Sequence, residues 1–315
     1  MEVRVNLSIR IKDMVLKNPV TVASGTAGYG EELARFIDIS KLGAIFTKGL
    51  SLKPRPGNRG NRIIETPAGT LNSIGLENVG LDCFLSEKLP FLLQNGASVI
   101  PNVAGHSVEE NVELCRTLSS MEHIYALELN VSCPNVKEGG IIFGTNMDRF
   151  TNLVEKSRAA TRCGLIVKLS PNVTDISEYA ERAQAIGADA VSAVNTFLGM
   201  KIDTGNKRPY FDNVIAGLSG PAIRPLAIQA VYRIFEKVHI PVIGLGGIAC
   251  FEDMLEFLMA GASAVSVGTM NMVDPTLSVT LIEKLERYLK SEQVDNIDNI
   301  IGIAHEKSGL SEDCS

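Results

Sequence analysis

Three asparagines and two lysines stand where short apolar runs of the chain end. Asn102, Asn130 and Asn195 close or follow such runs, and Lys48 and Lys168 occupy similar places. One such amide is usually a loop cap and one such lysine a salt-bridge partner. Together they favour a ligand, because amides donate and accept hydrogen bonds along a planar heterocycle and lysines attract an anion.

Cys133 is the one candidate nucleophile or base among these residues. A cysteine beside a strand end is more often a small buried apolar side chain. Here, however, Pro134 keeps Cys133 out of helical geometry, and glycines at 139, 140 and 144 flank a loop able to open and close. His106, the nearest histidine, is expected to be a loop or cap residue. Without a histidine partner, Cys133 suits proton abstraction better than acyl transfer.

Two glycine turns suit a phosphate group. The run 244–247 reads Gly-Leu-Gly-Gly, and Gly268-Thr269 follows the next apolar run. Glycines let backbone N–H groups approach phosphate oxygens, and Gly220 before a helix would add another donor. The first run also fits a G-x-G-x-x-A dinucleotide fingerprint. That match is weak, since no acidic residue for a ribose ends the following strand.

A repeated sequence pattern indicates which elements position these residues. Four times a helical stretch runs into Gly-Ala and then into a β-branched run, with the glycines at 43, 96, 187 and 261. Glycine at a helix C′ position accepts the left-handed conformation, and the apolar run after it reads as a buried parallel strand. Strands are predicted near 19–23, 43–47, 98–102, 126–130, 165–169, 190–194, 241–245 and 264–268.

Eight strands alternating with helices over about 250 residues predict a single (β/α)8 barrel (a TIM barrel), preceded by an N-terminal strand hairpin. The active site is then expected at the C-terminal ends of the strands, where the polar residues above would meet. A doubly wound open sheet is the structural alternative. We predict one domain over 1–315, with a terminal helix near 297–304 and a frayed tail over about 306–315.

Several helix boundaries can be predicted as well. Ser107-Val108-Glu109-Glu110 fits a capping box, and 148–160 carries apolar residues on one face. Pro221 and Pro225 fall where the helix before the seventh strand should begin.

Composition excludes several classes of function. The net charge of −6 argues against a nucleic-acid partner, and no apolar run is long enough to span a membrane. The basic residues between 53 and 62 are expected to be a solvated loop. Six cysteines show no CxxC pair or metal spacing, so we expect reduced thiols, no metal and no iron–sulfur cluster in this chain. A cytoplasmic location is expected.

The motifs resemble those of class 1 dihydroorotate dehydrogenase from about residue 5 to 305. The strings are LNSIGLEN (71–78), NVSCPNVKEGG (130–140), KLSPNV (168–173), VNT (194–196), GLSGPAI (217–223) and GLGGI (244–248). The Ser-Cys-Pro-Asn motif is specific for the cysteine-based class, since the membrane-bound class has serine as the base. The continuation Val-Lys-Glu-Gly-Gly resembles the B-type subclass, whose barrel chain pairs with a subunit carrying FAD and a [2Fe–2S] cluster.

The resemblance implies a role for each matching position. Cys133 would be the base that takes a proton from C5 of dihydroorotate while hydride leaves C6 for FMN, with Lys48 also in the catalytic set. Orotate would be held by Lys48, Asn72, Ser73, Ile74, Gly75, Leu76, Asn130, Asn135, Asn195 and Thr196. FMN would contact Ser24, Thr47, Lys48, Asn102, Asn130, Lys168 and Val194, with its phosphate on Gly220, Gly246, Gly247, Gly268 and Thr269.

The resemblance also implies partners, and alternatives stay open. A homodimer joined by an electron-transfer subunit into a heterotetramer would pass electrons to NAD+. The fumarate-linked A-type, a homodimer, would share every catalytic residue, although Thr196 replaces the serine expected there. A flavin barrel of the dihydropyrimidine dehydrogenase type would also suit the amides. A non-redox phosphate-sugar aldolase or isomerase is the alternative from another class.

Overall fold

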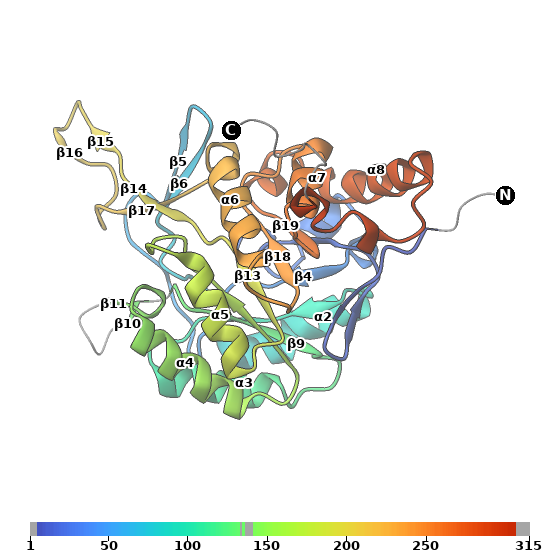
Figure 1. Cartoon of the computed structure of the whole chain (residues 1–315). Helices are drawn as coiled ribbons and strands as arrows, with labels where there is room; N and C mark the ends of the chain where they lie inside the picture. Colours follow the sequence, from blue (N-terminus) through green and yellow to red (C-terminus); the bar gives the residue numbers. More distant parts are fainter. Residues whose placement is uncertain (1–4, 133, 136–140, 307–315) are drawn as a thin grey trace, which may run out of the picture.

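A closed ring of parallel strands forms the centre of the molecule (Figure 1). The computed structural model describes residues 5–132, 134–135 and 141–306, and its largest sheet has the order β7-β4-β3-β19-β18-β13-β12-β9-β8. The end strands β7 and β8 are two pieces of one strand interrupted at Pro101, which has no N–H to donate. Because β7 pairs with β4 and β8 with β9, the ring closes. The predicted (β/α)8 barrel is confirmed, and the alternative prediction of an open doubly wound sheet is wrong.

Each of the eight predicted strands overlaps an observed one. The barrel strands are β3 (Val20–Val22), β4 (Ala44–Phe46), β7 (Val99–Ile100), β8 (Asn102–Val103), β9 (Ala126–Asn130), β12 (Gly164–Lys168), β13 (Ala190–Ala193), β18 (Val242–Gly244) and β19 (Ala264–Val267). Most of their residues are fully buried, as expected for parallel strands covered by helices.

The glycine of the repeated Gly-Ala pattern is required for two different physical reasons. Gly96, Gly187 and Gly261 are left-handed, with φ of +68°, +98° and +112°, as predicted. Gly43 is not, so the prediction was wrong there. A Cβ on Gly43 would lie 2.3 Å from the Asn18 carbonyl oxygen, so this glycine is required by close backbone approach.

Helices cover the outside of the ring (Figure 1). They are α1 (Gly80–Cys83), the π-turn η3 (Phe84–Lys88), α2 (Leu89–Gln94), α3 (Val108–Leu118), α4 (Met147–Ala160), α5 (Ile176–Ile186), α6 (Arg224–Phe235), α7 (Phe251–Met259) and α8 (Leu277–Ser291). The predicted helix over 148–160 is therefore confirmed. The predicted start of the helix before the seventh strand, at Pro221 and Pro225, is also confirmed, since the 3-10 turn η6 (Pro221–Ile223) leads directly into α6.

The N-terminus of α3 differs from the predicted capping box in one half. Ser107 is the N-cap, and its hydroxyl oxygen accepts from the Glu110 backbone N–H at 3.1 Å. The Glu110 carboxylate, however, accepts from the backbone N–H groups of His106 and Leu52 instead of that of Ser107. His106 is a loop residue before this cap, as expected.

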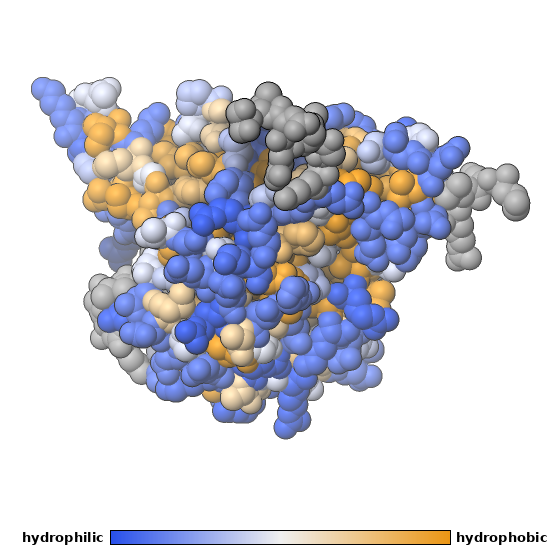
Figure 2. Space-filling view, viewed as in Figure 1, coloured by the Kyte–Doolittle hydropathy of each residue, from blue (hydrophilic) through white to orange (hydrophobic). Residues whose placement is uncertain are grey.

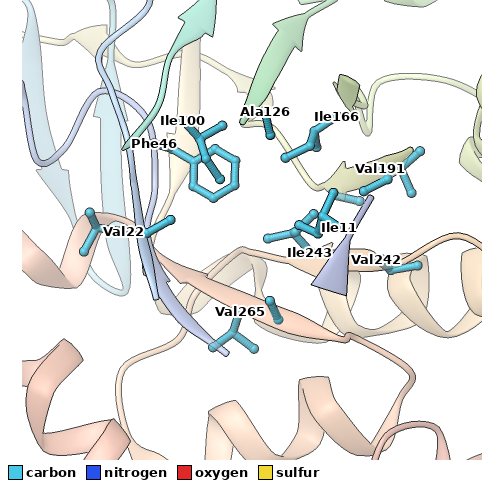
Figure 3. Packing of buried hydrophobic residues seen from close by; sticks show 14 of the residues in the cluster. Ile11, Val22, Phe46, Ile100, Ala126, Ile166, Val191, Val242, Ile243 and Val265 are labelled. Carbon is cyan, nitrogen blue, oxygen red and sulfur yellow. The ribbon is translucent and has the colours of Figure 1, made fainter. Parts of the chain in front are cut away.

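The predicted N-terminal hairpin closes the lower end of the barrel. Strands β1 (Ile9–Ile11) and β2 (Met14–Leu16) pair antiparallel, and Ile11 and Leu16 are fully buried. Figure 3 shows Ile11 among the apolar side chains of the barrel strands. The main hydrophobic core includes residues from Ile9 to Ile300, and Leu71, Phe211 and Ala216 form a small second cluster.

A small antiparallel sheet, which the sequence did not predict, lies over the upper end of the barrel. We call it the roof; its order is β14-β17-β6-β5, from Phe197–Gly199, Ala216–Ser219, Gly69–Asn72 and Ile63–Thr66. The short hairpin β15 (Ile202–Asp203) and β16 (Arg208–Pro209) projects beyond it as an arm (Figure 1). Strands β10 (Pro134–Asn135) and β11 (Ile141–Ile142) form another pair.

The remaining short elements are 3-10 turns. They are η1 (Leu33–Arg35), η2 (Ile39–Lys41), η5 (Phe143–Thr145), η7 (Thr269–Met272), η8 (Ile297–Asn299) and η9 (Ile303–His305). The predicted terminal helix over 297–304 is thus wrong, because the left-handed Gly302 separates two single turns. Residues 307–315 of the predicted tail lie outside the described residues. Among the helices described, none is long and apolar enough to cross a membrane.

Candidate active site

The polar residues singled out in the sequence converge at the upper end of the barrel. Lys48 follows β4, Asn130 and Lys168 close β9 and β12, and Asn195 follows β13. Because all barrel strands are parallel, their carboxyl ends open on the same side, beneath the roof. Asn195 Nδ2 donates to Asn130 Oδ1 at 3.3 Å, so residues 65 positions apart in the chain come into contact.

We call the opening at the carboxyl ends of the barrel strands the mouth. Lys168 and Asn102 form a buried layer at its bottom. The Lys168 ammonium, 4% exposed, donates to the Ser24 hydroxyl at 2.9 Å. Asn102 is fully buried, and its Oδ1 atom has no hydrogen-bond partner among the described residues. A buried amide oxygen without a partner is costly, so this atom is positioned to accept from a bound molecule.

Thr47 supports this layer from behind. Its hydroxyl oxygen accepts from the Asn102 backbone N–H at 3.2 Å, and its hydroxyl donates to the Lys48 carbonyl at the same distance. The Thr47 side chain is fully buried. It therefore joins the backbones of β4 and β8, and its hydroxyl is already engaged within the protein.

Asn130, Asn195 and Thr196 form one wall of the mouth. Asn130 Oδ1 also accepts from the Ser132 backbone N–H at 3.1 Å, and Asn195 Oδ1 accepts from that of Thr196 at 2.8 Å. Val194 is held by its backbone N–H, which donates to the Leu245 carbonyl at 2.8 Å. Asn172, which the sequence did not single out, donates to the Thr196 carbonyl at 3.0 Å.

Glycines with left-handed backbone line the side of the mouth formed by β17, β18 and β19. Gly220, Gly246 and Gly247 have φ of +93°, +135° and +82°. A Cβ on Gly247 would lie 2.8 Å from Arg224 Cβ and 2.9 Å from the Gly220 carbonyl oxygen, so only glycine fits. We call Gly220, Gly246 and Gly247 the glycine cradle. Across it, the Thr269 hydroxyl donates to Ser219 Oγ at 2.9 Å, and Gly268 directly precedes Thr269. Backbone N–H groups and two hydroxyls there suit a phosphate.

The lower face of the roof carries Asn72. In the register of the roof, Asn72, Gly217 and Leu198 are cross-strand neighbours and so share one face. A Cβ on Gly217 would lie 2.3 Å from Thr196 Oγ1, so this face looks into the mouth. Asn72 Nδ2 donates to the Gly217 carbonyl at 3.2 Å, which leaves its Oδ1 atom and second N–H for a ligand.

The loop after Asn72 is hydrogen-bonded to Asn58 at Ser73. The Ser73 carbonyl and hydroxyl oxygens accept from Asn58 Nδ2 at 3.1 and 3.0 Å. Gly75 and Leu76 then turn the chain with φ of +74° and +55°, and the Ile74 carbonyl accepts from the Asn58 backbone N–H. The Ser73 side chain thus shapes the loop, and the carbonyls of Ile74 and Leu76 accept hydrogen bonds from Asn58 and Asn78.

An ion-pair chain connects Lys48 to this loop. Lys48 Nζ lies 3.1 Å from Glu77 Oε2, and Arg62 Nη1 lies 3.1 Å from Glu77 Oε1. These two cations hold the pKa of the Glu77 carboxyl below its ordinary value, with Lys48 as the larger cause. Glu77 therefore stays ionised at neutral pH and holds the Lys48 ammonium at the edge of the mouth.

Cys133 and residues 136–140 lie outside the described residues. Asn135 is described only through its backbone, which pairs with Ile141 in the β10–β11 ladder. Among the described residues, no group of three or more His, Cys, Asp or Glu side chains could hold a metal ion.

Two cavities open near the mouth without belonging to it. One of about 540 Å³ is lined by 51–55, His106 and Glu109–Glu110, and one of about 490 Å³ by 171–175 and Tyr179 among others. The predicted ligand residues line neither, so we place the site by its convergent polar groups. The first cavity includes Lys53 and Arg55 of the basic loop.

Sequence reasoning missed four residues that the structure brings to the mouth. They are Glu77, Glu128, Asn172 and Ser219. Glu128 had a signal in the sequence, since it interrupts the apolar run of β9 and shares the inward face of that strand with Asn130. Ser219 adjoins the predicted Gly220, and Glu77 lies in the 71–78 string.

Comparisons with known proteins agree on one family. The family model described as dihydroorotate dehydrogenase matches residues 6–289. A dihydroorotate dehydrogenase B (NAD(+)) catalytic subunit of Trichlorobacter lovleyi is 49% identical over 94% of this chain and 97% of its own length. A protein of Aquifex aeolicus named as dihydroorotate dehydrogenase A (fumarate) is also 49% identical, over 95% of this chain and 98% of its own length.

A solved structure has the same fold. The dihydroorotate dehydrogenase of Eimeria tenella, in complex with ferulenol, superposes with a TM-score of 0.78 at 20% sequence identity. The match covers 96% of this chain and 89% of that one. At this identity the likeness supports the barrel and its roof as an architecture.

Proposed function

The chain belongs to the dihydroorotate dehydrogenase family, and from this premise we propose that it is the catalytic subunit of an NAD-linked enzyme that oxidises dihydroorotate to orotate in pyrimidine synthesis. One observation carries the proposal beyond family membership. The buried Asn102 amide and Lys168 ammonium lie at the mouth of the barrel, between a glycine cradle and the Asn72 face of the roof. This arrangement suits a planar phosphorylated cofactor with a small anionic substrate above it.

The residues at the mouth fit FMN. The unpartnered Asn102 Oδ1, the buried Lys168 ammonium and the glycine cradle offer an acceptor, a cation and a phosphate site. We assign the ring to Ser24, Lys48, Asn102, Asn130, Lys168 and Val194, with Thr47 as the support behind them. We assign the phosphate to Gly220, Gly246, Gly247, Gly268 and Thr269. When bound, FMN supplies the acceptor for the hydride that leaves C6 of the substrate.

The substrate site lies between the Asn130–Thr196 wall and the roof. Amides of Asn72, Asn130, Asn135 and Asn195 and the Thr196 hydroxyl suit the polar edge of a pyrimidine ring, and Lys48 suits its carboxylate. The backbone of 74–76 closes one side. Cys133 acts as the base, so its thiolate takes the C5 proton of dihydroorotate and becomes a neutral thiol.

The electron acceptor and the assembly are further parts of the proposal. The Trichlorobacter relative is named a catalytic subunit, which supports a partner for this chain. That partner would carry FAD and a [2Fe–2S] cluster. We propose a homodimer joined by that partner into a heterotetramer in the cytoplasm. Figure 2 shows hydrophobic residues gathered near β14 and β17. Exposed Leu198 of β14, Met200 and Ile202 of β15 are candidates for burial by another chain.

The equal identity of the Aquifex relative favours a second candidate, the fumarate-linked form. The two candidates differ in which acceptor reoxidises the enzyme. The purified chain alone should leave NAD+ unreduced if a partner is required, and should turn over with fumarate if it is A-type. Reduction of NAD+ by this chain alone would contradict the need for a partner.

We expect the purified chain to show a flavin absorption band that bleaches when dihydroorotate is added without oxygen. The bleaching reports transfer of two electrons from the substrate to the cofactor. An absorption spectrum before and after the addition measures it directly, with uracil and dihydrouracil as comparison ligands. A band that responds to dihydrouracil but not to dihydroorotate would indicate a dihydropyrimidine enzyme. A folded, FMN-supplemented preparation without flavin would favour the non-redox barrel.

Asn72→Ala is expected to raise KM for dihydroorotate about tenfold or more, with a smaller effect on kcat. A hydrogen bond to a charged or strongly polar ligand contributes roughly 1.5–3 kcal/mol. Steady-state kinetics of the FMN-loaded protein would separate the two parameters. Asn61→Ala is the matched control, because Asn61 is exposed and donates to the Tyr210 carbonyl near the same roof. An unchanged KM for Asn72→Ala would remove this residue from the substrate site.

A further inference from the structure

Glu128 is a carboxylate in the interior of the barrel, directly below the mouth. It is 1% exposed and lies in the middle of β9. One oxygen, Oε1, accepts from the Ser192 hydroxyl at 2.7 Å. The other, Oε2, accepts from Asn102 Nδ2 and lies 3.6 Å from the Lys168 ammonium. Two of its three partners are therefore residues that we assign to FMN.

The fold itself gives no reason for a charge at this position. Of its two neighbours in register, Ile166 of β12 is apolar and fully buried, as are most side chains of the barrel, and Asn102 of β8 is a residue that we assign to FMN. Replacing a buried ion pair with apolar groups is often neutral or stabilising, whereas a lone buried charge is costly. A buried Glu–Lys pair next to a ligand site therefore indicates a role toward the ligand.

Its first role is to orient the Asn102 amide. A carboxylate can only accept hydrogen bonds, so the Asn102 group that faces Glu128 must be the NH2. The opposite atom, Oδ1, is then the one that no residue in the described part of the chain contacts by a hydrogen bond. Glu128 thereby ensures that Asn102 offers an acceptor to the bound ring.

Its second role is to balance the charge of Lys168. The ammonium lies between Glu128 and Ser24, with side-chain exposures of 5% and 2% for Lys168 and Glu128. In this poorly solvated position the negative charge of Glu128 offsets most of the field of Lys168 at the mouth. Reduced FMN carries more negative charge at its pyrimidine end than oxidised FMN, and charge near that end tunes its potential.

We propose that Glu128 is a positioning residue that fixes the Asn102 amide and, by compensating Lys168, sets the reduction potential of the bound FMN. The inference rests on the proposed function, since it needs FMN at this mouth. Without Glu128 the uncompensated Lys168 would stabilise reduced FMN more than oxidised FMN.

A charge series at these two positions tests the proposal. With Glu128→Gln we expect the ratio of affinities for reduced and oxidised FMN to rise about tenfold, a shift of about +30 mV for a two-electron couple. Lys168→Met should shift the potential in the opposite direction, and the double variant should lie between the two single ones. The midpoint potential of each FMN-loaded protein is measured by equilibration with redox dyes.

Asp189→Asn is the matched control. Asp189 is also ion-paired, with Arg158 at 2.7 Å and Lys12 at 3.8 Å, but it directly precedes β13, at the opposite end of the barrel. Asp189→Asn removes one negative charge, as Glu128→Gln does, and should leave the reduction potential of FMN unchanged. A general effect of net charge or of looser folding would instead move both variants alike.

The outcomes separate this inference from the proposed function. A wild-type protein that binds no FMN contradicts the proposed function. A Glu128→Gln protein that binds FMN at the wild-type potential overturns the inference and leaves the function intact. If Glu128→Gln alone does not fold, the comparison is made between Lys168→Met and the double variant at saturating FMN. A double variant whose potential is not above that of Lys168→Met likewise overturns it.

Discussion

Cys133→Ser is expected to lower kcat for dihydroorotate oxidation at pH 7 by about 100-fold or more, since a positioned base contributes roughly 10²–10⁴ in rate. A serine hydroxyl is a far weaker acid than a thiol, so almost none of it is ionised at neutral pH. FMN binding should be unaffected, because the cradle and the Lys168 layer are unchanged. Anaerobic stopped-flow measurement of flavin bleaching isolates this step.

The pH dependence of the same step is a direct consequence of thiol chemistry. A free thiol has a pKa of about 8.5, and only its thiolate accepts the proton. The rate of the wild-type protein should therefore rise with pH through the thiol pKa and then level off. The serine variant should rise only at more alkaline pH.

Other cysteines provide the control for this experiment. Burial raises the pKa of Cys115 and of Cys163 to about 11, so both thiols are protonated at neutral pH. Cys163 directly precedes β12, at the end of the barrel opposite the mouth. Cys163→Ser should retain the wild-type rate and pH profile. A Cys133→Ser protein with near wild-type turnover would refute the assignment of the base.

Lys168→Met is expected to reduce the free energy of unfolding of the FMN-free protein by about 3–5 kcal/mol, the usual cost of leaving one partner of a buried ion pair uncompensated. Methionine fills nearly the same volume, so the loss reports the stranded Glu128 carboxylate. Urea unfolding followed by circular dichroism gives the value. Adding Glu128→Gln in the same chain should restore a large part of the lost stability, because the stranded charge is removed.

Lys12→Met is the matched control for that loss. Lys12 lies 3.8 Å from Asp189 with a third of its side chain exposed, and Asp189 keeps Arg158 as a partner. Exposed ion pairs contribute about 0–1 kcal/mol, so the change should be small. If Lys12→Met and Lys168→Met lower the free energy of unfolding by the same amount, the Glu128–Lys168 pair has no special role in stability.

The barrel could be predicted from sequence because its evidence is local. Each strand is a short apolar run, three of these runs follow a helix that ends at a left-handed glycine, and these signals depend on neighbouring residues only. Eight such units have one common closed arrangement, and parallel strands place their carboxyl ends together. The residues at those ends, such as Asn102, Lys168 and Thr269, could therefore be assigned to one mouth without any contact being known.

The roof could not be predicted in the same way. Its strands pair residues near 70 with residues near 217, and each strand has only three or four residues. Such short segments have no clear period in the sequence, and their partners are chosen by packing over the barrel. Gly43 and the turns near Gly302 were misjudged for a related reason, since close approach to Asn18 and the packing of a chain end are not local properties.

Motifs and the order of strands were enough to assign the family, the barrel and the set of polar residues at its mouth. The bonding partner of each polar group became known from the folded chain. It joined Glu128 to Asn102 and Lys168, Glu77 to Lys48, and Ser219 to Thr269. These pairs are 26 to 50 residues apart, and hydrogen-bond partners at such separations are set by the closure of the ring and the position of the roof.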